Sequence, residues 1–284
     1  MRWEDDRKSD NVEDRRGTGV SRGVVGGSIG TIIIVLVALF FGVDPSTLLN
    51  LNTTTNTSAP TSVTRHRSAD EDRLAEFVSV VLADTEDTWH ELFRRSGKEY
   101  REPKLVLFSQ EVKSACGFEK SATGPFYCPR DQKVYIDLQF FRALQDRFHA
   151  PGEFAQAYVI AHEIGHHVQN LMGISDKVER LREKSGKVQA NNLSVRLELQ
   201  ADCLAGIWGY HANRTKKILE AGDVEAALRA ASSIGDDRLQ KQGQGYVVPE
   251  SFTHGSSEQR VRWFKRGIET GDLAQCNTFT AASP

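Results

Sequence analysis

Three residues in the stretch from Ala161 to His167 have the types and the spacing for metal chemistry. His162 and His166 are four residues apart, and Glu163 follows the first of them in a run that predicts a helix. Because four residues make about one helical turn, both imidazoles project from one face and can bind the same ion. Glu163 then lies beside that ion, where it can act as a general base on water. The pattern HExxH therefore predicts a hydrolytic site built around one zinc ion.

A catalytic zinc usually has three protein ligands, so a further ligand is needed. The stretch Val195–Gly206 predicts a second helix, with its N-cap among residues 191–194. Glu198 and Asp202 are four residues apart on it and point the same way. We expect Glu198 to be the third ligand. We expect Asp202 to accept a hydrogen bond from the outer ring nitrogen of a ligating histidine and so to fix its tautomer.

Two observations exclude other zinc ligands near the motif. The extended metzincin motif requires glycine and histidine where this chain has Gln169 and Met172, which excludes that class. His167 is adjacent to a ligand and projects about 100° away from it on the helix. We therefore do not expect His167 to bind the ion.

With HExxH followed by ExxxD on a second helix, the chain resembles the gluzincins. More closely, it resembles a bacterial, membrane-anchored family of neutral zinc metallopeptidases. That resemblance covers nearly the whole chain apart from a Thr/Asn-rich stretch, and its further motifs are Met1–Trp3, Asn11–Gly17, Gly124–Pro129, Val134–Asp137 and Thr253–Trp263. It implies a zincin-like peptidase fold in which His162, His166 and Glu198 hold one Zn²⁺ and Glu163 is the catalytic glutamate.

A tetrahedral oxyanion would need a further hydrogen-bond donor. Our candidate is His254, with Tyr246 and Arg260 behind it, because its segment resembles the His-containing segment before the last helix of integral-membrane gluzincins. Ser256 and Gln259 fit a capping box for that helix. The alternative is that His254 is an ordinary surface histidine in a loop.

An apolar segment near the N-terminus predicts one membrane crossing. No residue from Gly23 to Val43 is charged, and such a helix spans about 30 Å. Several arginines and a lysine precede it, whereas none follows before Arg65, so residues 1–22 are expected in the cytoplasm and the body outside it. A cleaved signal peptide is the alternative, but no small-x-small cleavage site follows.

The remaining chain divides into a flexible linker at 44–67 and a zinc metallopeptidase domain at 68–284. Helical periodicity is expected over 70–95, from Pro151 to Leu171 with Gly173 as the stop, and near Asp223. Short strands are expected between residues 104 and 137, including a hairpin. We therefore predict an α+β, helix-dominated, zincin-like domain with a small antiparallel sheet, preceded by one transmembrane helix.

The four cysteines allow three pairings. Outside the cytoplasm an even number favours disulfides, and we favour Cys116 with Cys128 and Cys203 with Cys276. The alternative is four buried free thiols.

Composition limits the possible partners. The formal net charge is −2, and no basic stripe indicates nucleic-acid binding. A peptide or protein is the expected substrate, and Val134–Asp137 could hold an extended peptide if it is an edge strand. Two alternatives remain: a membrane-anchored binding or assembly protein with a structural metal site, and a metallohydrolase acting on a non-peptide amide.

Overall fold

The computed structural model describes residues 1–17, 68–120 and 124–284. Its main sheet has the strand order β1-β2-β6-β5, formed by Val12–Asp14, Lys104–Phe108, Lys133–Asp137 and Phe126–Cys128. Strands β1, β2 and β6 are parallel, and β5 runs antiparallel to β6. A separate hairpin joins β3 (Glu111–Ser114) to β4 (Gly117–Lys120).

This sheet corrects the predicted fold, because an entirely antiparallel sheet is wrong. Within the main sheet only the β5–β6 pair is antiparallel, since a short turn returns the chain directly alongside itself. Strand β6 lies between β2 and β5, so Val134–Asp137 is not the edge strand that the peptide-binding hypothesis required. Among the described residues, β5 is the last strand on that side.

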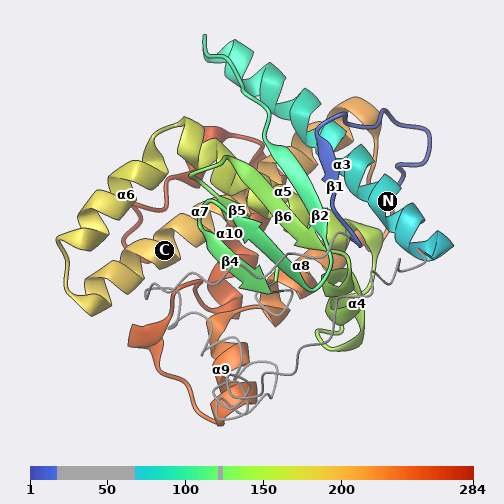
Figure 1. The fold of residues 1–284 in the computed structure, drawn as a ribbon. Coiled ribbons are helices and arrows are strands. Elements are labelled where there is room, and N and C mark those ends of the chain that lie inside the picture. Colours follow the sequence, from blue (N-terminus) through green and yellow to red (C-terminus); the bar gives the residue numbers. More distant parts are fainter. Residues whose placement is uncertain (18–67, 121–123) are drawn as a thin grey trace.

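The helices account for most of the described domain. Figure 1 shows the strands across the front, with α5, α7 and α10 behind them and α3 beside β1 and β2. The helices, in chain order, are α3 (Ala69–Arg95), α4 (Gln139–Asp146), α5 (Glu153–Leu171), α6 (Ile174–Glu183), α7 (Lys187–Lys216), α8 (Asp223–Ser233), α9 (Asp236–Gln244) and α10 (Ser257–Thr270), with short 3-10 helices η3 (Pro249–Ser251) and η4 (Leu273–Cys276).

Helix α5 has the predicted limits. It ends at Leu171, and Gly173 adopts φ 72°, a left-handed conformation that favours glycine after a helix. Helix α7 is longer than predicted, because its N-cap is Gly186 and the expected cap residues 191–194 lie inside it.

The three central helices approach one another at glycines. A Cβ on Gly165 of α5 would lie 3.0 Å from the Ala201 carbonyl oxygen of α7, and a Cβ on Gly206 of α7 would lie 2.3 Å from the Phe264 carbonyl oxygen of α10. Only glycine permits backbones this close. The packing brings one face of α5 and one face of α10 against the middle of α7.

The N-terminal residues are part of the folded domain. Trp3 is buried and packs edge-on against Phe77 of α3, the Ser9 hydroxyl donates 2.5 Å to the buried Glu86, and β1 pairs with β2 (Figure 1). Residues 1–16 and the body therefore lie together.

This arrangement corrects the predicted topology. The described helices include none with the length and apolar composition to cross a membrane. The segments predicted as a transmembrane helix (23–43) and a linker (44–67) lie outside the described residues. A single crossing that left residues 1–22 in the cytoplasm and the body outside is wrong, because strands paired in one sheet cannot lie on opposite sides of a membrane.

Both favoured cysteine pairings are present as disulfides. Cys116 is bonded to Cys128, and Cys203 is bonded to Cys276. The first ties the β3–β4 hairpin to β5, and the second ties η4 to the middle of α7.

Candidate metal centre

Helices α5 and α7 bring together the three side chains that the sequence predicts as ligands. One donor atom from each of His162, His166 and Glu198 lies within 4.8 Å of the others. The Nε2 atoms of His162 and His166 lie 3.2 and 3.4 Å from the two carboxylate oxygens of Glu198. Two imidazoles and a carboxylate are a donor set that fits zinc.

The outer nitrogens of both histidines are engaged by other side chains. Nδ1 of His162 lies 2.8 Å from Asp202, and Nδ1 of His166 lies 2.9 Å from the side-chain oxygen of Gln169. Because these partners accept, each Nδ1 carries a proton, and each Nε2 would present its lone pair to an ion bound beside Glu198. Two imidazole nitrogens and a carboxylate that converge in this way can hold a cation between them.

Without an ion, the neighbours of His162 favour its protonated form. Burial disfavours its charged form, but the charge and hydrogen bond of Asp202, together with Glu198, outweigh burial and raise the pKa of His162 to about 10. Burial would raise the pKa of Glu198, but His166 and His162 hold it well below its ordinary value. In the absence of an ion, protonated His162 supplies the positive charge beside Glu198. A divalent cation would take the place of its Nε2 proton.

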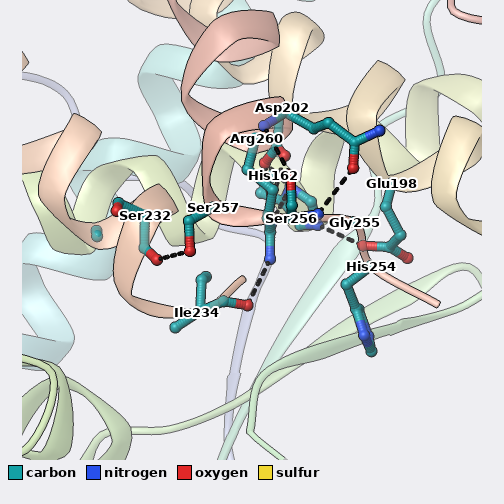
Figure 2. Close-up of polar contacts among 12 residues, drawn as sticks. His162, Glu198, Asp202, Ser232, Ile234, His254, Gly255, Ser256, Ser257 and Arg260 are labelled. Atoms are coloured by element: carbon teal, nitrogen blue, oxygen red, sulfur yellow. Dashed lines mark hydrogen bonds and ion pairs between the residues drawn. The ribbon is translucent and has the colours of Figure 1, made fainter. Parts of the chain in front are cut away.

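Asp202 is the centre of a buried network (Figure 2). It is fully buried, and its carboxylate accepts from His162, from the Tyr158 hydroxyl at 2.5 Å and from two nitrogens of Arg260 at 2.9 Å. Burial opposes ionisation, but the Arg260 charge outweighs it and lowers the pKa of Asp202 to about 2. Helix α10 therefore holds the carboxylate that orients His162.

Glu163 follows His162 on α5 and is 8 % exposed. Burial raises the pKa of Glu163 above its ordinary value, although His162 and His166 oppose the shift. A carboxylate with a raised pKa is suited to exchange protons near neutrality.

His254 lies just before α10, on the Glu198 side of the site in Figure 2. Asp236, the first residue of α9, accepts the backbone N–H groups of Thr253, His254 and Gly255 and lies 3.3 Å from Nδ1 of His254. Burial opposes the imidazolium, but Asp236 and Glu198 raise the pKa of His254 to about 9. Its side chain is 52 % exposed, so solvent screens these interactions.

The residues predicted behind His254 do not form one group with it. Arg260 points to Asp202 and to the Ile234 carbonyl oxygen, as Figure 2 shows. Tyr246 is 63 % exposed after α9. Ser256 and Gln259 form the expected capping box of α10.

Both ring nitrogens of His167 contact groups outside the cluster of candidate ligands. Its Nε2 donates to the Arg101 carbonyl oxygen at 2.6 Å, and its Nδ1 lies 3.0 Å from the Tyr127 hydroxyl of β5. Burial lowers the pKa of His167 to about 4, so the neutral ring joins α5 to the edge strand.

Three residues of the site were missed in the sequence. Tyr158 precedes His162 by one helical turn, and Gln169 follows His166 by almost one, so helical spacing alone could have indicated both. Asp236 begins a different helix and has no such local signal. Its contacts depend on how α9 and α10 are packed.

Comparison of the sequence with known proteins identifies its relatives. The family model described as "Putative neutral zinc metallopeptidase" matches residues 1–279. "Uncharacterized protein YpfJ" of Escherichia coli (strain K12) is 53 % identical, with 98 % of this chain and 99 % of that protein covered. "Uncharacterized protein Rv2575" of Mycobacterium tuberculosis (strain ATCC 25618 / H37Rv) is 39 % identical, with 86 % of each chain covered. No solved structure matches this chain.

Proposed function

We propose that this chain, which belongs to the neutral zinc metallopeptidase family, hydrolyses peptide bonds with one zinc ion held by His162, His166 and Glu198. The observation that carries the proposal is the convergence of their donor atoms within 4.8 Å, with a glutamate adjacent to one ligand. A site kept only for stability would need the ligands but not Glu163.

A zinc ion bound there would supply Lewis acidity, which lowers the pKa of water to about 7 and polarises a carbonyl group. Glu163 accepts the proton that water loses as it attacks the peptide carbon, and then delivers that proton to the leaving amine. Burial raises the pKa of Glu163, which favours its acceptance of this proton.

His254 is proposed to donate a hydrogen bond to the oxyanion of the tetrahedral intermediate. Its side chain is accessible, and it is attached to a segment that Asp236 holds through three backbone N–H groups. A donor preorganised in this way stabilises charge that develops only in the transition state.

An extended peptide is proposed to lie along β5. Among the described residues β5 is the outer strand of the sheet, and Tyr127 connects it to His167, next to a ligand on α5. In the described part of the chain no strand pairs with its outer edge, and an edge of this kind can add a strand through backbone hydrogen bonds.

Removal and return of the metal test the proposal. The chelated protein, and the same protein reloaded with one equivalent of zinc, would be incubated with a peptide library and with small non-peptide amides. Zinc-dependent cleavage of internal peptide bonds, detected by mass spectrometry, supports the proposal. Zinc-dependent cleavage of the non-peptide amides alone, or of no substrate, would contradict it.

A further inference from the structure

The two histidines of the metal centre are supported in chemically different ways. His162 rests on the charged Asp202, whereas His166 rests on the neutral amide of Gln169. Gln169 is completely buried. A buried amide keeps a fixed orientation only if all of its polar atoms have partners, so the contacts of Gln169 decide how firmly His166 is held.

Those contacts continue across α7 to the C-terminal region. The Gln169 amide nitrogen donates to the Leu197 carbonyl oxygen at 2.7 Å and to the side-chain oxygen of Gln200 at 3.1 Å. The Gln200 amide nitrogen donates to the Cys276 carbonyl oxygen at 2.9 Å. We call Gln169 and Gln200 the amide relay.

Backbone carbonyl groups set the orientation of both side-chain amides in the amide relay. A carbonyl oxygen can only accept, so the Leu197 and Cys276 oxygens require both glutamines to present their NH₂ groups to them. The Gln169 oxygen then faces His166, whose Nδ1 must be the donor. Its Nε2 lone pair is consequently left for the metal.

The carbonyl that ends the amide relay is itself anchored. Cys276 is bonded to Cys203, the residue after Asp202 on α7, and its carbonyl oxygen also accepts from the Thr278 backbone at 3.0 Å. Asp202, which supports His162, and Gln200, which supports His166 through Gln169, therefore both lie next to the Cys203–Cys276 disulfide.

We propose that Gln169 and Gln200 are positioning residues that hold His166 in its metal-binding tautomer, and that the Cys203–Cys276 disulfide maintains this support. Breaking the disulfide would free the Cys276 carbonyl, loosen the amide relay and weaken zinc binding. This inference rests on the proposed zinc site, but it adds a dependence on the oxidation state of one cysteine pair.

The first test is the zinc affinity of Gln169→Met, measured by competition with a chromophoric chelator. Methionine has a similar length but cannot accept from His166, and outer partners of ligating histidines typically contribute about 10–100-fold in affinity. We expect the zinc affinity of Gln169→Met to fall by a factor in that range. The zinc affinity of Gln200→Met should also fall. The matched control is Gln156→Met on the same helix, because the Gln156 side-chain oxygen is buried without a hydrogen-bond partner among the described residues. Its zinc affinity should stay within about twofold of wild type.

The second test observes the histidine itself. In ¹⁵N-histidine-labelled, zinc-free protein, the Nδ1 proton of His166 should exchange slowly with solvent. Gln169→Met should make that exchange fast, while circular dichroism shows that the variant is folded. Slow exchange in Gln169→Met, or wild-type zinc affinity in that variant, would overturn the role of the amide relay.

The third test separates the two disulfides. Replacing Cys203 and Cys276 with alanine should lower zinc affinity by about tenfold or more, whereas replacing Cys116 and Cys128 should leave it within about twofold. Equal affinities for the two double variants would overturn the coupling to the disulfide. Failure of the wild-type protein to bind zinc would instead refute the proposed function and, with it, the positioning role.

Discussion

At the scale of single residues, the site combines groups whose protonation is controlled by neighbours from other helices. Asp202 remains ionised because Arg260 of α10 faces it, and His254 remains protonated because Asp236 of α9 faces it. The two pairs have different exposure: Asp202 is fully buried, whereas His254 is half exposed. The first pair therefore fixes a ligand, while the second remains accessible to a substrate.

Replacement of His254 tests its proposed contact with the oxyanion. His254→Ala should lower kcat by about 10²–10³-fold, because one such donor contributes about 3–4 kcal/mol to transition-state stabilisation. Zinc affinity should be unchanged, because His254 is not one of the converging donors. Steady-state kinetics on a cleaved peptide would measure the effect, with Tyr246→Phe as an exposed control. A kcat within about threefold of wild type would refute the proposed role of His254.

The pH profile tests the charge of the same residue. The pKa of His254 is raised to about 9, so the donating imidazolium is present at neutral pH and is lost as the pH rises through that value. The rate should therefore fall on the alkaline side near pH 9. Asp236→Asn should move this fall toward 6.5, the ordinary pKa of histidine. An alkaline limb that Asp236→Asn leaves in place would show that another group controls it.

At the scale of the elements, the metal centre depends on close helix crossings. Gly206 of α7 lies against α10, whose Arg260 holds Asp202. Gly165 of α5 lies against Ala201 of α7, and this second crossing explains why His162 and Asp202 meet although they lie on different helices.

A methyl group at Gly206 should disturb that crossing. It would lie 2.3 Å from the Phe264 carbonyl oxygen, and such overpacking costs about 1–3 kcal/mol or more. We expect Gly206→Ala to lower the free energy of unfolding by at least this amount and to weaken zinc binding. Gly186→Ala is the control, since its Cβ would meet nothing within 4 Å. Equal urea midpoints for the two variants would contradict this account of the crossing.

The sequence predicts some of these elements better than others. The spacings of His162 with His166 and of Glu198 with Asp202 place each pair on one helix face, because that periodicity is local. The parallel pairing of β1 with β2 joins residues about ninety positions apart along the chain, such as Val12 and Leu105. No local pattern encodes such a pairing, so the sheet was wrongly expected to be antiparallel.

At the scale of the whole molecule, the N-terminal residues complete the fold. The first strand forms one edge of the main sheet, and Ser9 satisfies a buried carboxylate of α3. The apolar run from Gly23 to Val43 led to a topology that separated these residues from the body. Hydropathy reports the environment that a segment prefers, but it does not report which distant strands pair.

Trp3 should contribute strongly to global stability. It is 5 % exposed and packs on Phe77, and removal of a buried tryptophan costs about 3–5 kcal/mol. Trp3→Ala should therefore lower the free energy of unfolding by an amount in that range, measured in the full chain by urea denaturation. Met172→Ala, at a side chain that is 42 % exposed, should change it by less than about 1 kcal/mol. If both variants had wild-type stability, the N-terminal residues would not be an integral part of the domain.

The central claim is that Glu163 acts on water in a site where His162, His166 and Glu198 hold the metal. The most direct test compares wild type with Glu163→Gln at equal zinc content on one cleaved peptide. We predict the same zinc affinity within about threefold and a kcat lowered by at least about 10²-fold, because glutamine cannot accept the proton. Equal turnover by the two zinc-loaded proteins would contradict the account.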